Sequence, residues 1–426
     1  MSTATTVDGE VIKHQGWTVT FAAMGINLAL GILYTWSVIS KRIPEEWGWN
    51  QTDKSLPFMV ACLVFSIAMV PAGRLQDRIG PRWVATLGGL LVGLGMILAS
   101  LTQSSLGVTL AFGVLAGVGI GFGYASATPP AVKWFSPART GLIAGIVVSG
   151  FGLASVYTAP LSMWLIAAVG VQQTFLILGI AFLVIVCGLA QILTPPRRAL
   201  QFIERGGDLG VQKVVAKSET KTKVDFRPTE MLRTWQFFLL WFMYACGAGA
   251  GLMVIAKLDD IAKKQAAIEL GFILVAVMAI GNGGGRILTG IVSDKIGRKA
   301  TLMICFILQT ILVLLLWQAR QGSFLASPVI LGVISALIGA NYGANLALFP
   351  SITKDFYGLK NFGVNYGLVF TAWGVGGFML AWVAGQMYDR YQSFDIAYFG
   401  AAGLLVLAAI VTLFIKPPHR QEAQAA

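Results

Sequence analysis

One arginine lies inside a long apolar stretch of the sequence, where a permanent positive charge needs a partner. Arg286 occurs in the run GNGGGRILTGIV and comes eight residues before Asp294. A helix rises about 1.5 Å per residue, so Arg286 would lie about 12 Å from the charged loop that begins at Asp294. A charge inside a bilayer is costly unless a ligand, water or a fixed group offsets it. Arg286 is therefore the leading candidate for binding an anion.

The acidic residues offer Arg286 no obvious countercharge. The chain has 19 aspartates and glutamates, and in the predicted topology all of them fall in loops or at helix ends. A guanidinium binds a carboxylate at two points, which favours an organic anion as the missing partner. Alternatively, Arg286 could donate to main-chain carbonyl groups, or its long side chain could reach an acidic residue at a helix end.

Polar and aromatic residues in the apolar runs extend the candidate site. Asn282 lies four residues before Arg286 on the same helix face, where its amide could bind a carboxylate or orient the guanidinium. One cation, several hydroxyl groups and apolar walls suit a small carboxylate, although aromatic side chains also pack well elsewhere in a helical bundle. The further candidates are Tyr34, Trp36, Tyr124, Asn341, Tyr342, Asn345, Phe370 and Trp373.

Four glycines stand directly before Arg286, at positions 281, 283, 284 and 285. No Lys-Ser or Lys-Thr pair follows them, so a phosphate-binding loop is excluded. Glycines inside a membrane span allow either close helix packing or local unwinding beside a cavity. Both arrangements are compatible with a binding site.

Composition identifies the elements that must position these residues. The chain has 426 residues, of which 56% are hydrophobic and 12% charged, with a mean hydropathy of +0.74. This balance predicts an all-α polytopic membrane protein with twelve spans. We expect the spans to start near Trp17, Leu56, Trp83, Leu106, Gly141, Thr174, Trp235, Ala267, Thr301, Phe324, Phe362 and Ile396.

Neither the cysteines nor the histidines suggest catalysis or metal binding. The four cysteines lie inside apolar runs without paired spacing, and the two histidines, His14 and His419, lie outside the spans. We therefore predict no enzyme activity, no metal and no cofactor.

The basic residues are unevenly distributed between the two sides of the predicted topology. With a cytoplasmic N-terminus, 22 of the 31 lysines and arginines fall on the cytoplasmic side. This bias is the positive-inside rule, so it places both termini in the cytoplasm and explains the net charge of +12 without nucleic acid. We expect a multi-pass protein of a bacterial inner membrane that functions as a monomer.

The chain repeats one plan twice. The segment GRLQDRIGPR begins at Gly73, and the related GIVSDKIGRK begins at Gly290, each after the second span of its half. PPAVKWF at Pro129 and PSITKDF at Pro350 form a second pair of similar segments, separated by nearly the same number of residues as the first pair. We predict two six-helix bundles, residues 1–194 and 235–426, joined by a polar cytoplasmic linker, residues 195–234. The repeated loops are predicted gating motifs, in which an Asp and several cations hold a neighbouring helix end in one of two states. Their residues are Gly73, Asp77, Arg78, Gly80 and Arg82 in the first half, and Gly290, Asp294, Lys295, Gly297 and Arg298 in the second.

Two six-helix halves with such loops resemble the major facilitator superfamily over essentially the whole chain. The segments NGGGRILTGIVSDKIGR and NYGLVFTAWG are similar to those of the oxalate:formate antiporter and its relatives, the monocarboxylate transporters. In that family the Arg matching Arg286 is taken as the carboxylate ligand. The antiporter carries a second substrate-facing cation, a Lys, where this chain has Trp373. A single cation matches a monoanion better than a dianion.

The resemblance also limits what can be said about coupling. Animal monocarboxylate transporters have an Asp where this chain has Asn282 and a Lys where it has Val38, so the usual proton-handling pair is missing. We predict a secondary transporter of small monocarboxylates such as L-lactate or pyruvate, coupled to protons, with Asp259 and Asp260 as candidate proton carriers. The alternative is an oxalate:formate type exchanger. We do not favour a membrane sensor, because neither the linker nor the C-terminal tail suggests an output domain. We do not favour an enzyme, because the sequence shows no catalytic constellation.

Overall fold

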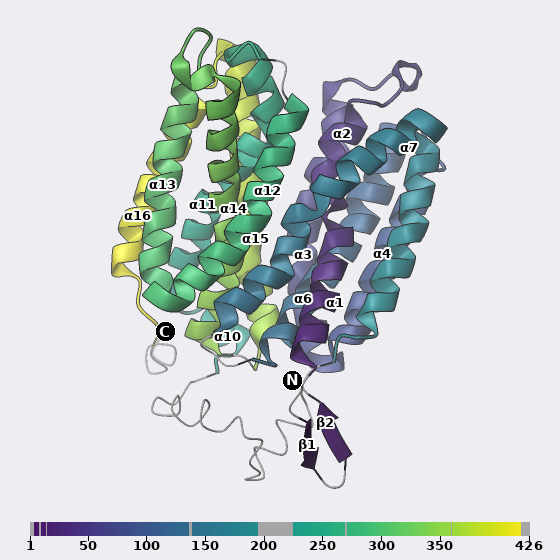
Figure 1. The fold of residues 1–426 in the computed structure, drawn as a ribbon, viewed down its shortest axis with the longest axis vertical. Helices are drawn as coiled ribbons and strands as arrows, with labels where there is room; N and C mark the ends of the chain where they lie inside the picture. The colour runs from purple at the N-terminus through teal and green to yellow at the C-terminus, as the bar shows by residue number, and fades with distance from the viewer. Residues whose placement is uncertain are drawn as a thin grey trace.

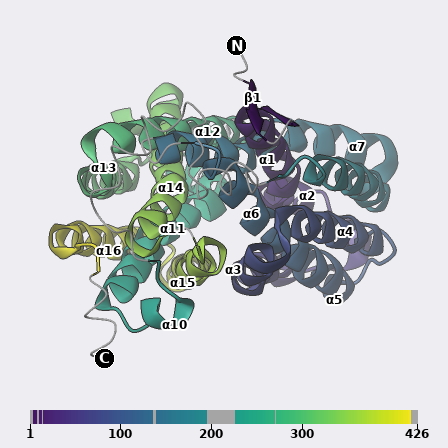
Figure 2. The same cartoon turned by 90° about the horizontal axis from the view of Figure 1, so that it is seen from below.

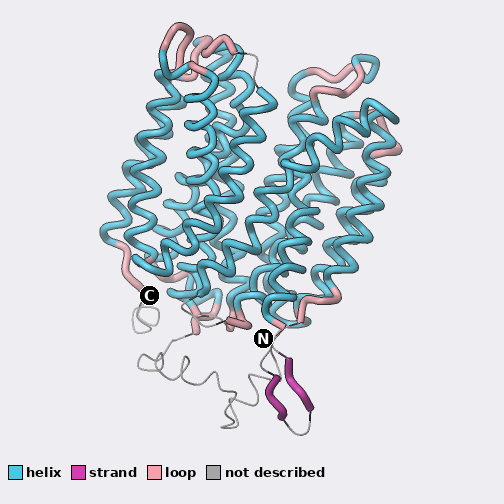
Figure 3. The backbone as a smooth tube through the Cα atoms, in the orientation of Figure 1, coloured by secondary structure: helices cyan, strands magenta, loops and turns pink. Residues whose placement is uncertain are grey.

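A computed structural model describes residues 4–7, 10–13, 15–135, 139–194, 225–268, 271–358 and 360–418 of the chain. Long helices form almost all of this part of the protein (Figures 1 and 3). Two short strands, β1 (Ala4–Val7) and β2 (Glu10–Lys13), pair antiparallel before the first helix and outside the helical body. The predicted all-α membrane fold is confirmed for the body of the protein.

The first half contains five long helical units. They are α1 to α2 (Gly16–Leu30, Gly31–Thr35 and Trp36–Ser40), α3 (Gln51–Ile79), α4 (Pro81–Ala99), α5 to α6 (Ser105–Val108, Thr109–Ala116 and Gly117–Val132) and α7 (Thr140–Ala190). A capping box starts α3, because the Asn50 side chain accepts from the Asp53 N–H at 2.8 Å and the Asp53 carboxylate accepts from the Asn50 N–H at 3.1 Å.

The helix α7 supplies two of the predicted spans. It has 51 residues, about twice the length that a bilayer requires. Gly170, with φ 82° and ψ 172°, breaks its helical geometry and turns the chain back. Eleven described helices are long and apolar enough to cross a membrane, and the break at Gly170 turns one of them into two crossings. The prediction of twelve spans agrees with this count.

The second half follows the same plan. Its helices are α10 (Pro228–Met231), α11 (Trp235–Asp260), α12 (Gly271–Ile296), α13 (Arg298–Gln318), α14 (Pro328–Tyr357), α15 (Phe362–Tyr391) and α16 (Asp395–Phe414). The spans that were predicted to start near Ala267 and Phe324 begin four residues later, at Gly271 and Pro328. Ala267 has a φ of 58° before α12, and Phe324–Ala326 form a separate short turn before Pro328, which occupies the first turn of α14.

The two halves lie side by side as separate bundles (Figures 1 and 2). The helix α7 packs against α12, and α3 packs against α15, so each half supplies one helix to each of two matching contacts. Both chain ends lie at the same end of the molecule, where the ribbons of the two halves converge (Figure 1). At the opposite end, the ribbons diverge. We call the converging end the terminal end.

The two repeated loops, residues 73–82 and 290–299, are called the gate loops below. They have the same backbone conformation in both halves. Gly80 ends α3 with a φ of 96°, and Gly297 ends α12 with a φ of 90°. These values favour glycine at both positions, and they let a new helix begin within one residue. The predicted linker, residues 195–234, lies largely outside the described residues; its last ten residues carry α10 and lead into α11.

Candidate substrate site

Arg286 is completely buried in α12. Its Nε donates to the Asn282 Oδ1 at 2.9 Å, and its Nη1 donates to the main-chain oxygen of Val148 on α7, in the other half. Its Nη2 has no hydrogen-bond partner among the residues that the structure describes. Among the described residues, no carboxylate forms an ion pair with Arg286. The guanidinium is thus fixed on two sides and left with one donor group for an anion.

Glycines bring α7 and α12 into main-chain contact around this arginine. A Cβ atom on Gly145 would lie 2.5 Å from the Arg286 main-chain oxygen, and one on Gly152 would lie 3.1 Å from the Arg286 Nε. At the terminal end, Gly141 and Gly290 approach each other equally closely. No side chain fits between the helices at these points, so Arg286 can reach Val148 across the boundary between the halves.

Three of the four glycines that precede Arg286 allow close packing, whereas Gly284 faces open space. The helix α12 is continuous through all four positions, so the predicted alternative of local unwinding is wrong. A Cβ on Gly281 would lie 2.0 Å from the Ala336 main-chain oxygen, and one on Gly285 would lie 2.3 Å from that of Ala340. Both contacts are with α14, so α12 is wedged tightly between α14 and α7.

A chain of hydrogen bonds joins the halves beside Arg286. The hydroxyl groups of Tyr34 and Tyr342 lie 2.5 Å apart, and the Trp373 Nε1 donates to the Tyr342 hydroxyl at 2.9 Å. All three residues are buried. Tyr34 belongs to the first half, whereas the other two belong to the second, so this chain is a polar link across the boundary.

Aromatic rings fill the centre of the boundary. Tyr124 lies with its ring 5.5 Å from that of Phe370, which stacks on Trp373 at 5.2 Å with an interplanar angle of 19°. Phe65, on α3, contacts the rings of all three residues at 5.1 to 5.4 Å. Phe151, on α7, contacts Tyr124 at 5.4 Å. Sequence reasoning missed Phe65 and Phe151, because an apolar ring in an apolar run gives no signal.

Several predicted site residues make other contacts. The Asn341 side chain donates to the Leu337 oxygen of its own helix at 3.0 Å. Trp36 stacks on Phe112 within the first half and donates to the Lys54 oxygen. The predicted proton carriers, Asp259 and Asp260, end α11, and their side chains lie outside the described part of the structure.

The aspartates of both gate loops bind the first N–H groups of a helix in the opposite half. The Asp294 carboxylate, at the end of α12, accepts from the N–H groups of Gly141 and Leu142 of α7 at 3.1 and 3.0 Å. The Asp77 carboxylate, at the end of α3, accepts from those of Gly363 and Val364 of α15 at 3.4 and 3.2 Å. A negative charge at a helix N-terminus is favourable, so both contacts hold the terminal end closed.

The cations of the gate loops differ in their contacts. Arg298 donates to the Asp294 carboxylate at 2.6 Å and to Asp355 at 3.1 Å. Arg78, Arg82 and Lys295 are exposed, and in the described ranges none of them forms an ion pair. In this conformation, these three residues make no ion pair with the aspartates, which bind main-chain N–H groups instead, so their gating role stays a prediction.

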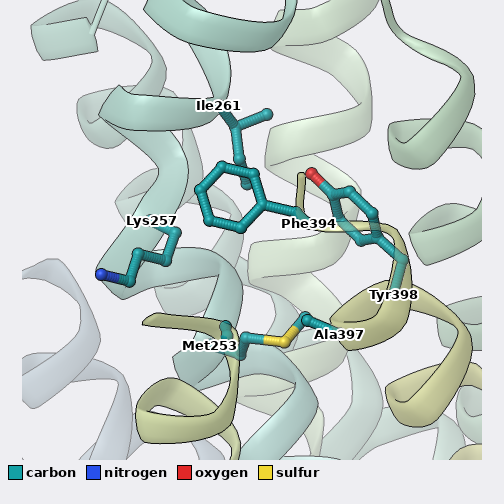
Figure 4. A pocket seen from close by; sticks show the side chains of 7 residues that line it. Met253, Lys257, Ile261, Phe394, Ala397 and Tyr398 are labelled. Atoms are coloured by element: carbon teal, nitrogen blue, oxygen red, sulfur yellow. The ribbon is translucent and has the colours of Figure 1, made fainter. Parts of the chain in front are cut away.

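A hollow with no room for a water molecule lies away from Arg286, between α11, α15 and α16. Figure 4 shows Lys257 pointing its ammonium group away from the rings of Phe394 and Tyr398. The residues that line the hollow are Met253, Lys257, Ile261, Ala384, Phe394, Ala397 and Tyr398. The walls are thus mostly apolar and present no charge to the interior, so we place the candidate site at Arg286.

Comparisons with known proteins agree with this architecture. The family model described as the Major Facilitator Superfamily matches residues 16–261 and 252–426, which together span nearly all of the chain. The chain belongs to the major facilitator superfamily. It is 26% identical to the "Oxalate:formate antiporter" of Oxalobacter formigenes, over 85% of this chain and 82% of that protein. It is 24% identical to "Monocarboxylate transporter 14" of Mus musculus, over 92% and 87%.

A solved superfamily structure has the same fold. The "proton:xylose symporter XylE" superimposes with a TM-score of 0.67 at 13% identity, over 96% of this chain and 98% of that one. At this identity, the likeness establishes the architecture alone. The superfamily comprises membrane transporters, so this protein is a multi-pass transporter and not an enzyme.

Proposed function

We propose that this superfamily member is a secondary transporter of small monocarboxylates, such as L-lactate or pyruvate, which binds the carboxylate through Arg286. One observation carries the proposal: Arg286 is completely buried, has no carboxylate partner in the described structure, and keeps its Nη2 unbonded. A buried charge of this kind is strongly unfavourable without a counterion. A substrate carboxylate supplies the charge and accepts the remaining donor.

The surroundings of Arg286 favour a monoanion. Trp373 occupies the position of the second cation in the antiporter, and here it is buried against Phe370 and bonded to Tyr342. A dianion would need a second countercharge in this low-dielectric site, whereas one guanidinium balances one carboxylate. The aromatic rings provide an apolar wall for a methyl group. The names of the two relatives, which refer to oxalate, formate and monocarboxylates, agree with this substrate class.

The two gate loops support alternating access around this site. Asp77 and Asp294 join the halves at the terminal end, whereas the bundles diverge at the other end (Figure 1). Release of these contacts, with closure at the opposite end, would expose Arg286 to the two sides in turn. We propose that the terminal end faces the cytoplasm, because most lysines and arginines fall on that side of the predicted topology, and that the membrane is a bacterial inner membrane.

Proton symport is our first proposal for the coupling, and anion exchange is the second. In symport, Asp259 or Asp260 would carry the proton. Exchange is favoured by the lack of a carboxylate beside Arg286 in the described residues, because an empty carrier would then have to reorient with an unneutralised buried charge. A carrier with this property moves only when loaded.

Uptake of labelled L-lactate into proteoliposomes tests the function, with empty liposomes as the blank. We expect uptake to rise with an acid-outside pH gradient, and Arg286→Lys to lower it at least tenfold, because an ammonium cannot keep the bonds that Nε and Nη1 make to Asn282 and Val148 and also present a fixed donor to a carboxylate. Arg320→Lys is the matched control, since Arg320 is exposed and pairs with Asp395. Uptake that requires a preloaded carboxylate would establish exchange, and unchanged uptake by Arg286→Lys would refute the site.

A further inference from the structure

A short segment before α11 is bonded to the helix ends beside the Asp77 contact. This segment, residues 225–234, contains α10 and lies at the terminal end, where α10 contacts α15 (Figures 1 and 2). The Arg227 N–H donates to the Glu230 carboxylate at 2.7 Å, and Pro228 occupies the first helical position of α10. The segment therefore has a fixed local fold, and we call residues 225–234 the docking segment.

Phe226 bonds the docking segment to both α14 and α15. Its main-chain N–H donates to the Tyr357 oxygen, at the end of α14, at 3.0 Å. Its main-chain oxygen accepts from the side-chain amides of Asn361 and Asn365 at 3.0 and 3.2 Å. The Phe226 ring is buried and meets the Tyr357 ring edge to face at 5.5 Å. The end of one helix and the start of the next are thus held against a single residue.

The docking segment also fixes the turn between α14 and α15. The Asp225 Oδ1 accepts from the Lys360 N–H at 3.0 Å, and the Thr234 and Tyr357 hydroxyl groups lie 3.0 Å apart. Gly358 has a φ of 82°, and a Cβ atom on it would collide with the Asp225 carboxylate. Glycine therefore permits both the turn and the close approach of the docking segment.

The side chains that bind Phe226 enclose the N–H groups that bind Asp77. Residues 361–365 contain the start of α15, and the first and last of their side chains donate to Phe226. Between them, the N–H groups of Gly363 and Val364 donate to the Asp77 carboxylate at 3.4 and 3.2 Å. Helix N–H groups point along the helix axis, so their direction follows the orientation of this turn. Because both bonds are already long, a small rotation of the turn would weaken them.

We propose that Phe226 is a positioning residue for the terminal end, which aims the first N–H groups of α15 at the Asp77 carboxylate of the other half. The bonds of Phe226 join parts of the second half only, so they persist while the halves separate and let the Asp77 contact form again in each cycle. This role rests on the alternating access proposed above, but not on the identity of the substrate. It gives the last part of the linker a function beyond connecting the halves.

Removal of the two side-chain donors, with Phe226 left in place, tests this role. Asn365→Leu keeps the approximate shape of the completely buried side chain, and Asn361→Ala removes the second amide. Pulsed electron spin resonance between labels at positions 82 and 300, exposed residues of the two halves, measures the ratio of closed to open terminal end after replacement of the native cysteines. We expect the double variant to lower this ratio about threefold. When Asp77→Asn is also present, we expect no further change, because the donors act through Asp77.

Asp225 provides a second test at an exposed position, where a substitution leaves the core intact. Asp225→Ala removes the acceptor for the Lys360 N–H, and we expect the same ratio to fall about twofold. Asp225→Asn keeps the Oδ1 acceptor and should restore the wild-type ratio. Thr412→Val is the control for loss of a buried polar group, since the Thr412 hydroxyl bonds within α16 and to Met243 of α11.

Each other outcome overturns the positioning role. An unchanged ratio in the double variant shows that Asp77 meets α15 without help from Phe226. An equal fall with and without Asp77→Asn shows that the two amides support the fold rather than the Asp77 contact. If the double variant does not fold, equal ratios in the two Asp225 variants refute the role. Failure of Asp77→Asn itself to change the ratio refutes the gate and the positioning role together, whereas uptake of L-lactate tests the substrate separately.

Discussion

The two gate loops have the same sequence pattern and the same backbone turn, but the structure supports them differently. Asp294 binds two helix N–H groups at 3.1 and 3.0 Å, and Arg298 binds its carboxylate at 2.6 Å. Asp77 binds its two N–H groups at 3.4 and 3.2 Å. The residue that corresponds to Arg298 in the first half is Pro81, which begins α4 and cannot donate to the carboxylate.

The second pair of similar segments, at Pro129 and Pro350, also differs between the halves. Lys354 pairs with Asp355 at 3.0 Å, and Asp355 pairs with Arg298, so a chain of charges supports Asp294 from α13 and α14. The corresponding lysine of the first half, Lys133, contributes its charge near Asp77. Two copies of one motif therefore need not hold the two halves together with equal strength. We expect the α12–α7 contact to hold the terminal end closed more firmly than the α3–α15 contact.

The largest expected effect is that of Asp294→Asn. The neutral amide offers only one acceptor oxygen to the two N–H groups and removes the ion pair with Arg298, at a cost of about 2 kcal/mol. The ratio of closed to open terminal end should fall about thirtyfold. Pulsed electron spin resonance between spin labels at positions 82 and 300, exposed residues of the two halves, measures this ratio once the four native cysteines have been replaced. An unchanged distance distribution would refute the role of Asp294.

Asp77→Asn should have a smaller effect of the same sign. Its two hydrogen bonds are longer and no arginine donates to it, so we expect a loss of about 1 kcal/mol and a fivefold change in the same ratio. The same pair of spin labels measures it. Equal shifts in Asp77→Asn and Asp294→Asn would show that the charge chain adds nothing, and the comparison between the loops would fail.

Arg298→Gln should have the smallest effect. It removes the ion pairs with Asp294 and Asp355, but Asp294 keeps its bonds to α7. Because Asp294 keeps both helix N–H bonds and the Gln amide can still donate to a carboxylate, we expect about 0.5 kcal/mol and a twofold change in the closed-to-open ratio. High salt should reduce the difference from wild type. A shift as large as that of Asp294→Asn would mean that Arg298, rather than the helix N–H groups, holds the loop.

Much of the fold could be predicted because its causes are local. Runs of apolar residues set the spans, and the glycines of the gate loops set the turns between paired helices. The boundaries at Gly271 and Pro328 could not be read from hydropathy, since they depend on the backbone conformation of Ala267 and on a proline in the first helical turn. By contrast, the break at Gly170 agrees with the predicted start of a new span near Thr174, because the apolar run is too long for one crossing.

The candidate site was less predictable from the sequence. The isolation of Arg286 from acids could be inferred, but its bond to the Val148 oxygen could not, because every residue has a main-chain carbonyl and these two positions are 138 residues apart. Tyr244 and Tyr366 gave the same signal as Tyr124, a hydroxyl group in an apolar run. What distinguishes them is their contact with the Phe370 ring, which depends on the packing of α6, α11 and α15.

The glycine contacts between α7 and α12 also affect the kinetics of conformational change. Interdigitated side chains must change rotamer before two helices can separate, and each such step adds to an activation barrier. Where main chain meets main chain, as at Gly141, Gly145 and Gly290, there are no side chains to disengage. At these points, the barrier to separation comes from polar bonds rather than from rotamer changes. Close to the terminal end, turnover of the carrier becomes sensitive to the chemistry of Asp77 and Asp294.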